Sequence, residues 1–388
     1  MLINSMEFEN YTTKQKIEKI TFDKLNLLVG RSGAGKTQIL KTLSSYIAVA
    51  SSESTISSIQ FEGYFEAEFF MPLPITDDDF KERKVSWKIY TDKMKNIVRE
   101  YELYRLSYGV SKEILLIDDE EIIHRTKDNL LINRKENVPI SPEQSALSVF
   151  KDAQKISYIR ANLFSIVSYY HQMNAMNDID KVTFEQIKNQ FYRINNDNYD
   201  SYLSKTKMRT FLFFYPVLIQ IYVMKKYDIA LFNEFLLRLQ NIFPSIEDVK
   251  IDSLNDTNYF TLFIKENGKW ISKESISSGM LKSIYILAIT TFSIDGNVIL
   301  LDELENSLGV NCLDEITSYI VNEADNATQF ILTSHHPYII NNIPEKYWHI
   351  VSQNDGIISS KKANDVGIST VNNRQDRFFQ LINYMQRQ

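Results

Sequence analysis

The 388-residue sequence is poor in cysteine and in glycine. Its single cysteine, Cys312, excludes a disulfide framework and a zinc site built on cysteine thiolates. A reducing compartment suits such a chain, so a cytoplasmic location is expected. Of its eleven glycines, three lie among the eight residues from Gly30 to Thr37. Such a concentration marks a place where the backbone turns tightly or approaches a ligand closely.

The sequence also lacks an apolar run long enough to cross a membrane as a helix. The most apolar stretch, residues 211–224, is shorter than the roughly 20 residues that a spanning helix needs, and it contains Pro216 and Gln220. Residues 1–7 lack the basic and hydrophobic segments of a signal peptide. We therefore expect no membrane partner, and we predict a buried or partner-facing helix at residues 211–224.

The composition has no excess of positive charge. The net charge is −6, which gives no general electrostatic attraction to nucleic acid. Local basic clusters occur at residues 81–84, 205–209 and 225–226, where solvated faces are a simpler interpretation than a phosphate track. With 44% hydrophobic and 24% charged residues, the chain has a normal soluble composition. Its length suggests one large domain with an inserted lobe.

The residues from Gly30 to Thr37 match the pattern G-x-x-x-x-G-K-[ST] of a phosphate-binding loop. Residues 25–29 before them are predicted to form a buried strand, and residues 37–43 after them to begin an amphipathic helix. In such a loop, successive backbone N–H groups point at a phosphate, and the helix N-terminus adds partial positive charge. The alternative is a chance glycine-rich turn, which would not explain strand, lysine and helix together.

This loop predicts a nucleotide site with ATP and Mg²⁺ as ligands. Lys36 is expected to reach the β- and γ-phosphates, and the Thr37 hydroxyl to bind Mg²⁺. The residues of this segment predicted to bind the nucleotide are Gly30, Arg31, Ser32, Gly33, Ala34, Gly35, Lys36, Thr37 and Gln38.

A second segment suited to nucleotide chemistry lies far along the chain. Residues 298–301 are apolar and are followed by Asp302 and Glu303. The apolar run suits a strand buried on both faces of a parallel sheet, so the two acids would lie at its carboxyl end. Asp302 is expected to ligate Mg²⁺ and Glu303 to polarise the attacking water. A solvated acidic turn is the alternative, which the upstream phosphate loop makes less attractive.

Two further segments flank this acidic strand. Ser277, Ser278 and Gly279 open an apolar-periodic stretch, residues 280–292, and so predict a helix start that could bind an anion. An ordinary helix cap is the alternative. His335 follows an apolar strand, residues 330–332, and could hydrogen-bond a terminal phosphate. A histidine in a turn is otherwise usually structural or solvated.

In this order, the motifs resemble the ABC-type head of the SMC/RecF-like ATPases. The segments that carry the resemblance are Gly30–Thr37 for Walker A, Ser277–Lys282 for the signature motif, Val298–Glu303 for Walker B, Glu305–Leu308 for the D-loop and His335 for the switch histidine. The resemblance covers residues 1–50 and 245–355. It also includes a strand expected near Ile156–Arg160.

The sequence departs from the family pattern at several positions. Short bacterial members often have His-Pro where residues 309–310 are Gly-Val, the transporter signature has glycine in place of Ser278, and many SMC-like chains have asparagine in place of Ser32. Gln60 and Gln154 are both candidates for the glutamine loop. ATP binding is expected despite these departures, whereas the hydrolysis rate is left open and could be slow.

The resemblance implies a mechanism that needs two copies of the chain. Two heads meet head-to-tail and enclose two ATP molecules. Ser277 and Gly279 of one copy contact the γ-phosphate that Lys36 of the other copy holds, while Glu303 activates water and His335 senses the γ-phosphate. Binding closes the dimer and hydrolysis opens it, which is a population shift driven by contacts to the γ-phosphate.

The expected fold class is α/β: an ABC-type P-loop NTPase head with a mainly parallel core sheet, an antiparallel β-lobe and a helical insertion. Alternating apolar residues within residues 56–120 predict the strands of the lobe. The expected domains are the N-terminal half of the head at 1–160, the helical insertion at 161–245, and the C-terminal half at 246–388. The insertion lacks the sustained heptads of a long coiled-coil arm.

The function implied by the resemblance is that of an ATPase that controls a separate protein. Nucleases related to the overcoming-lysogenization-defect family share this head but carry a TOPRIM domain, which is not recognisable here. The chain therefore resembles the stand-alone ATPases of bacterial anti-phage defence, such as the Septu ATPase PtuA, the PARIS ATPase AriA and retron-associated relatives. A homo-oligomer, a nuclease or toxin as effector, and DNA or a phage protein as trigger are the expected partners.

Three alternatives stay open. A RecF-like DNA-repair ATPase would act as an ATP-dependent clamp and would need a basic groove across the paired heads. A structural scaffold would use ATP as an adhesive between subunits, with marginal hydrolysis. An ABC transporter subunit would need a surface for membrane partners, which the sequence does not favour.

Overall fold

The computed structural model describes residues 1–51, 56, 59, 61–75, 79–98, 103–137, 139–150, 153–168, 178–194, 209, 213, 215–254, 258–326, 328–368 and 374–387. The chain divides into two compact units. Unit 1 consists of Met1–Ile166, Ile331–Thr333 and Pro344–Gln388, and unit 2 consists of Val167–Phe330 and Ser334–Ile343. The fold is mixed α/β, with parallel strand pairs in its large sheet and a separate antiparallel sheet, in agreement with the predicted fold class.

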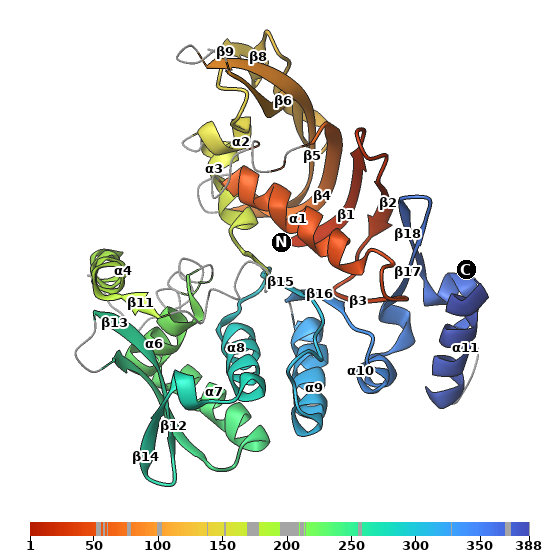
Figure 1. Ribbon diagram of the computed structural model, residues 1–388. Helices are drawn as coiled ribbons and strands as arrows, with labels where there is room; N and C mark the ends of the chain where they lie inside the picture. The colour runs from red at the N-terminus through yellow and green to blue at the C-terminus, as the bar shows by residue number, and fades with distance from the viewer. Residues whose placement is uncertain are drawn as a thin grey trace. The chain divides into compact units, whose positions relative to one another are not determined.

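Unit 1 holds most of the strands (Figure 1). Its elements are β1 (Leu2–Asn10), β2 (Lys16–Thr21), β3 (Leu25–Val29), α1 (Lys36–Ser51), β4 (Gly63–Pro74), β5 (Phe80–Val98), β6 (Leu103–Ile117), β7 (Glu120–Arg125), β8 (Leu130–Ile132), β9 (Lys135–Asn137), α2 (Ala146–Val149), α3 (Gln154–Leu163), β17 (Trp348–Asn354), β18 (Ile357–Lys362) and α11 (Arg374–Arg387). Two further strands, β10 (Ile166–Ser168) and β16 (Gln329–Thr333), contain points where the chain passes between units.

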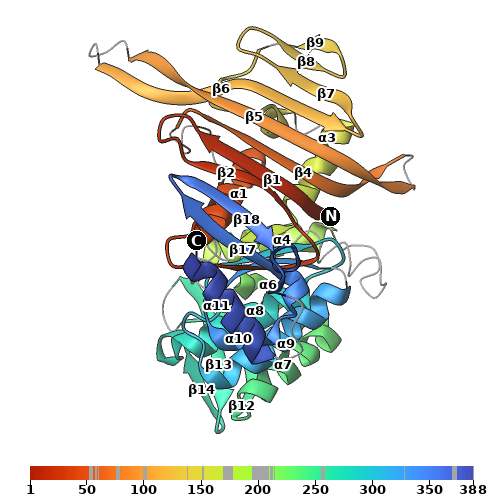
Figure 2. The ribbon, with the colours of Figure 1, turned by 90° about the vertical axis from the view of Figure 1, so that its right-hand side faces the viewer.

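Strands β1, β4, β5 and β6 lie side by side in an antiparallel arrangement (Figure 2). Their side chains alternate between the two faces, and the inward-facing aromatic residues are covered by α1. Tyr46 of α1 is buried and stacks on Phe65 of β4, with the edge of Trp87 of β5 against it. The predicted antiparallel strands within residues 56–120 are thus confirmed.

One expected element is wrong. The strand anticipated near Ile156–Arg160 is instead part of helix α3. The buried residues of this segment are Ile156, Ile159 and Leu163, which are three and four positions apart and therefore share one face of a helix. Gln154 is the first residue of α3, and Gln60 lies outside the described residues.

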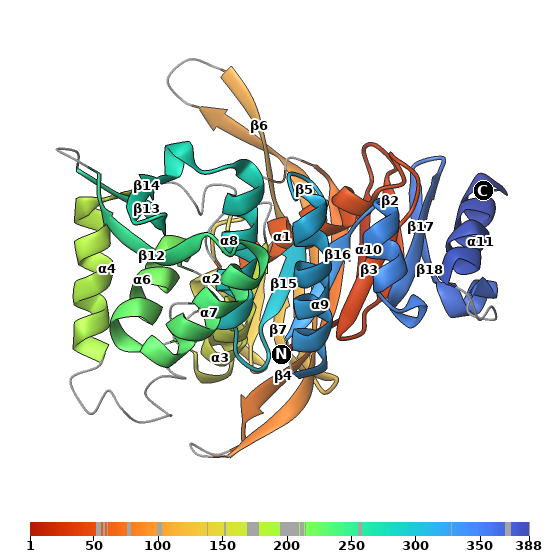
Figure 3. The ribbon, with the colours of Figure 1, turned by 90° about the horizontal axis from the view of Figure 1, so that it is seen from below.

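Unit 2 holds most of the helices (Figure 3). Its elements are β11 (Ile179–Asp180), α4 (Lys181–Ile194), α6 (Val217–Tyr227), α7 (Ile229–Ile242), β12 (Ile246–Ser253), β13 (Tyr259–Glu266), β14 (Lys269–Ser272), α8 (Ser278–Phe292), β15 (Val298–Leu301), α9 (Val310–Asn326) and α10 (Pro337–Asn342). Strands β11 to β14 form the separate antiparallel sheet.

Helix α8 is the centre of unit 2. Every residue from Lys282 to Phe292 is buried, and α6, α7 and α9 pack around the helix. Because this helix is surrounded by other helices, its apolar residues are spread around the helix and are not confined to one stripe. Strand β15 is likewise buried at each of its four positions.

The part of the apolar stretch from Val217 to Met224 contributes to the same core. Helix α6 begins at Val217, after Pro216, and its residues Val217–Ile221 are buried. Gln220 donates its amide N–H groups to the carbonyl oxygens of Phe213 and Tyr215, which satisfies a buried polar group. No helix in the described part of the chain has the length and apolar character that a membrane span requires.

A buried polar cluster holds the β-lobe of unit 1 together. Glu113 of β6 is fully buried and accepts hydrogen bonds from Trp87 Nε1 at 3.0 Å, from the Ser145 hydroxyl, and from the backbone N–H that starts α2. Arg125 lies 3.7 Å from the same carboxylate and donates to carbonyl oxygens of residues 140–144. Glu113 therefore connects three strands to the helix that follows them.

We predict that Glu113→Ala lowers the free energy of unfolding by about 3–5 kcal/mol, because it leaves the buried Arg125 and three hydrogen-bond donors without their carboxylate. The exposed Glu120 of β7 offers a matched control, since Glu120→Ala should change stability by only about 0.5 kcal/mol. Urea unfolding followed by far-ultraviolet circular dichroism measures both. Equal midpoints for Glu113→Ala and the control would contradict the role of this cluster.

Candidate functional site

The predicted site residues fall into two groups. Gly30 to Gln38 lie in unit 1, whereas Ser277, Ser278, Gly279, Asp302, Glu303 and His335 lie in unit 2. Each group has its own geometry.

The loop of unit 1 connects the fully buried strand β3 to helix α1. Gly33 and Gly35 have φ angles of +81° and +95°, in the left-handed region that favours glycine. A Cβ atom on Gly30 would lie 2.4 Å from the carbonyl oxygen of Val351, and one on Gly35 would lie 2.4 Å from Ile358 Cδ1. The backbone therefore follows a path that only glycine permits at these positions.

Lys36 and the first turn of α1 make the loop electropositive. The Lys36 Nζ donates to the carbonyl oxygens of Gly30 at 2.9 Å and Arg31 at 3.1 Å, which places its ammonium group over the loop. Helix α1 has no acidic residue in its first turn, so no side chain there neutralises the partial positive charge of its N-terminus. Thr37 and Gln38 lie half-buried in this turn. The arrangement is chemically suited to an anion.

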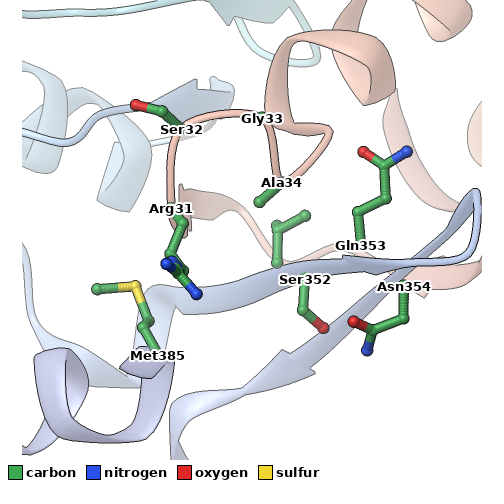
Figure 4. A pocket seen from close by; sticks show the side chains of 9 residues that line it. Arg31, Ser32, Gly33, Ala34, Ser352, Gln353, Asn354 and Met385 are labelled. Atoms are coloured by element: carbon green, nitrogen blue, oxygen red, sulfur yellow. The ribbon is translucent and has the colours of Figure 1, made fainter. Parts of the chain in front are cut away.

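A pocket of about 220 Å³ adjoins the loop (Figure 4). It is lined by residues 31–34 of the loop, residues 351–354 of β17, and Met385 of α11. Figure 4 shows the side chains of Arg31 and Met385 beside each other, and Ser352 and Asn354 on the β17 side. Sequence motifs did not identify the residues from β17 and α11, because they lie more than 300 positions further along the chain.

A buried hydrogen-bond system fixes the strand that leads into the loop. Asn26 of β3 exchanges hydrogen bonds with the backbone of Asp23, and its Oδ1 lies 3.0 Å from Nε2 of His349 on β17. Because Oδ1 accepts from the Asp23 N–H, the same atom accepts from His349, so Nε2 carries the proton. Burial, together with the nearby Lys362, lowers the pKa of His349 to about 4.

In unit 2, the turn after β15 has an unusual backbone. Glu303 and Ser307 have φ angles of +46° and +65°, which non-glycine residues adopt only where surrounding contacts hold them. Asp302 is half-buried, whereas Glu303 is exposed and its Oε2 accepts a 3.4 Å hydrogen bond from Asn306. This places the predicted metal ligand and the predicted base in one turn.

The start of α8 packs against the same turn. Ser277 caps the helix, with its hydroxyl accepting from the Met280 N–H, and Ser278 is exposed. A Cβ atom on Gly279 would lie 2.6 Å from the carbonyl oxygen of Ser307, so glycine is needed for this close approach. The structure thus brings the signature-like residues next to the D-loop-like residues.

Lys282 ties α8 to this turn. Its buried Nζ donates to the carbonyl oxygens of Glu303 at 2.8 Å and Asn306 at 2.7 Å. Burial lowers the pKa of Lys282 to about 8, although the neighbouring carboxylates, Glu305 foremost, oppose that shift. Lys282 is the last residue of the signature-like segment, but sequence reasoning assigned it no role. Both of its partners are backbone carbonyl groups, which every residue has, so the sequence does not reveal these contacts.

His335 also contacts the turn after β15. Its backbone N–H and its Nδ1 lie 2.9 and 2.8 Å from Oε1 of Glu305, a residue that the sequence motifs placed in the D-loop without a function. The neighbouring His336 has a structural role instead, because its Nδ1 accepts from the Tyr338 N–H and caps α10. The two histidines of this segment are therefore distinguished by their partners.

Comparison with protein families agrees with this arrangement. The family model described as "AAA domain, putative AbiEii toxin, Type IV TA system" matches residues 25–341, which include both groups of site residues. The chain belongs to this family of AAA domains. No curated protein sequence matches this AAA domain significantly.

A solved structure of an Smc head shares the fold of this AAA domain. An Smc head bound to the C-terminal winged-helix domain of ScpA is similar with a TM-score of 0.53 and 13% identity, over 93% of this chain and 98% of that chain. An Smc head with an extended coiled coil, bound to the C-terminal domain of ScpA from Pyrococcus furiosus, gives 0.45 and 14% over 94% and 97%. The SMC head domain from Thermotoga maritima gives 0.41 and 12% over 93% and 99%. At 13% identity, the first of these matches establishes similarity of fold alone.

The metal prediction has a limited basis in the donor atoms. No cluster of three or more His, Cys, Asp or Glu side chains suited to a metal ion occurs among the described residues. Thr37 and Asp302 would supply a hydroxyl and a carboxylate oxygen, which are donors that Mg²⁺ accepts. Mg²⁺ in nucleotide sites takes most of its ligands from water and phosphate, so the donor chemistry of each of these residues suits the ion.

We predict that acid destabilises the protein through His349. Its pKa is lower in the folded than in the unfolded chain, so stability is lost as pH falls from 6.5 to about 4, by about 3 kcal/mol in total. His349→Gln keeps an N–H donor for Asn26 and should remove this component of the pH dependence. Urea unfolding at pH 7, 6, 5 and 4 measures the difference. Parallel curves for wild type and His349→Gln would contradict the assignment.

Proposed function

We propose that the protein binds ATP at residues Gly30–Gln38 and hydrolyses it to ADP and phosphate. The observation that carries this proposal is the loop between β3 and α1. Glycine-only backbone positions, the Lys36 ammonium over the loop and a helix N-terminus without acidic neighbours favour a bound polyphosphate. Membership of the AAA family supports the same ligand.

The remaining site residues are proposed to act on the terminal phosphate. Thr37 and Asp302 would hold Mg²⁺, which neutralises charge on the phosphate oxygens. Glu303 is exposed and would orient and deprotonate the attacking water, and His335 would hydrogen-bond the γ-phosphate.

We further propose that two copies meet head-to-tail around ATP. Ser277 and Ser278 are exposed at the N-terminus of α8, and the first turn of this helix has no acidic residue. Such a helix end favours an anion, so it suits a phosphate held by a second copy. This supports the assignment of Ser277, Ser278 and Gly279 as ligands supplied from the partner copy.

A second protein is the proposed target of this ATP cycle. The Smc head of similar fold was solved with a domain of ScpA, which is the observation that favours partnership with another polypeptide. We therefore propose an effector, such as a nuclease or toxin, whose activity depends on whether the ATP-bound pair is closed, in a bacterial defence role.

Two substitutions separate ATP binding from hydrolysis. Lys36→Ala should weaken ATP binding at least about tenfold, because it removes a charge-assisted contact to the phosphates. Glu303→Gln should keep ATP binding and lower the hydrolysis rate by about 10²–10⁴-fold, because it removes the base. Equilibrium dialysis with labelled ATP and a phosphate-release assay measure the two effects.

Matched controls for these variants are available close in sequence to each motif. Lys24→Ala and Asp295→Asn alter exposed residues close in sequence to each motif and should behave as wild type. If Lys36→Ala binds ATP as tightly as Lys24→Ala, the assignment of the nucleotide site is wrong. If Glu303→Gln hydrolyses ATP as fast as Asp295→Asn, Glu303 is not the base.

A further inference from the structure

Glu305 forms a two-point contact with His335. Its Oε1 atom accepts a hydrogen bond from the His335 backbone N–H at 2.9 Å and lies 2.8 Å from Nδ1 of the ring. The Glu305 side chain is only 9% exposed, whereas the His335 side chain is 62% exposed. A mostly buried carboxylate therefore holds the backbone and one ring nitrogen of a residue whose ring otherwise faces outward.

This contact determines which ring nitrogen faces outward. A carboxylate oxygen can only accept, so the short distance to Nδ1 requires that Nδ1 carries a proton. Nε2 is then the nitrogen on the side of the ring away from Glu305. Because the backbone N–H binds the same oxygen atom, rotation of the ring about its first side-chain bonds would break a hydrogen bond to a buried acceptor.

Glu305 is itself held in place by the rest of the turn. Lys282 of α8 binds the carbonyl oxygens of Glu303 and Asn306, which flank Glu305 on both sides. The Lys282 ammonium also supplies positive charge near the Glu305 carboxylate, which offsets part of the cost of burying it. The carboxylate is thus a fixed point between the start of α8 and His335.

We propose that Glu305 is a positioning residue for ATP hydrolysis, acting through His335. By holding Nδ1 and the backbone N–H, it presents Nε2 of His335 outward in a defined orientation. This inference rests on the proposed ATPase function, in which His335 contacts the γ-phosphate. Glu305 itself does not need to touch the nucleotide.

The test is a double-mutant cycle on the full chain. Glu305→Ala should lower kcat for ATP hydrolysis by about tenfold or more, the size typical of residues that orient a functional histidine. KM for ATP should change less than twofold. In a His335→Ala background, Glu305→Ala should have no further effect on kcat, because its effect passes through the missing ring. Glu305→Gln keeps an acceptor oxygen and should retain most of the activity.

Glu315→Ala, on the neighbouring helix α9, is the matched control and should leave kcat unchanged. Equal losses from Glu305→Ala in the wild-type and His335→Ala backgrounds would overturn the proposal, since they would show an effect that is independent of His335. Full activity of Glu305→Ala would overturn it as well.

A spectroscopic measurement separates this inference from the proposed function. In protein labelled with ¹⁵N-histidine, the ring signals that disappear in His335→Ala belong to His335. They should report a protonated Nδ1 in wild type and should shift in Glu305→Ala. If the wild-type protein does not hydrolyse ATP, the proposed function fails. The ring signals would still show whether Glu305 contacts Nδ1 of His335. Unchanged signals in Glu305→Ala would overturn the inference even in an active enzyme.

Discussion

The strained turn after β15 is the constraint on which the chemistry of unit 2 depends. Glu303 and Ser307 adopt left-handed backbone conformations in this turn, which persist only because neighbouring groups hold them. Lys282 binds two carbonyl oxygens of the turn. Gly279, at the start of α8, packs closely against a further carbonyl oxygen, that of Ser307. One short segment therefore orients the acidic residues, the signature-like helix end and, through its carboxylate Glu305, the histidine after β16.

In unit 1, the main constraint is the path of the loop between β3 and α1. This path requires glycine at two positions, since a Cβ atom on Gly30 would collide with β17 and one on Gly35 would collide with β18. The loop therefore needs rigid neighbours, and the Asn26–His349 hydrogen bond between β3 and β17 supplies one such fixed point.

The features that the sequence predicted correctly are those that depend on short stretches of consecutive residues. The phosphate loop, the Ser277 cap of α8 and the acidic end of β15 all follow from residues adjacent in the chain. Lys282, Glu305, His349 and Met385 could not be assigned roles, because their partners lie at distant positions or are carbonyl groups. The strand expected at Ile156–Arg160 is wrong because the buried apolar residues of this segment are spaced three and four positions apart, which specifies a helix.

The central claim is that ATP is held by the loop of one copy and the α8 terminus of another. The most direct measurement mixes two inactive variants, Lys36→Ala and Ser278→Arg, in equal amounts and follows ATP hydrolysis. Each mixed pair then contains one site with an intact loop and an intact α8 terminus, so roughly a quarter of wild-type activity should return. A mixture as inactive as its two folded components, or full activity of Ser278→Arg alone, would contradict the account.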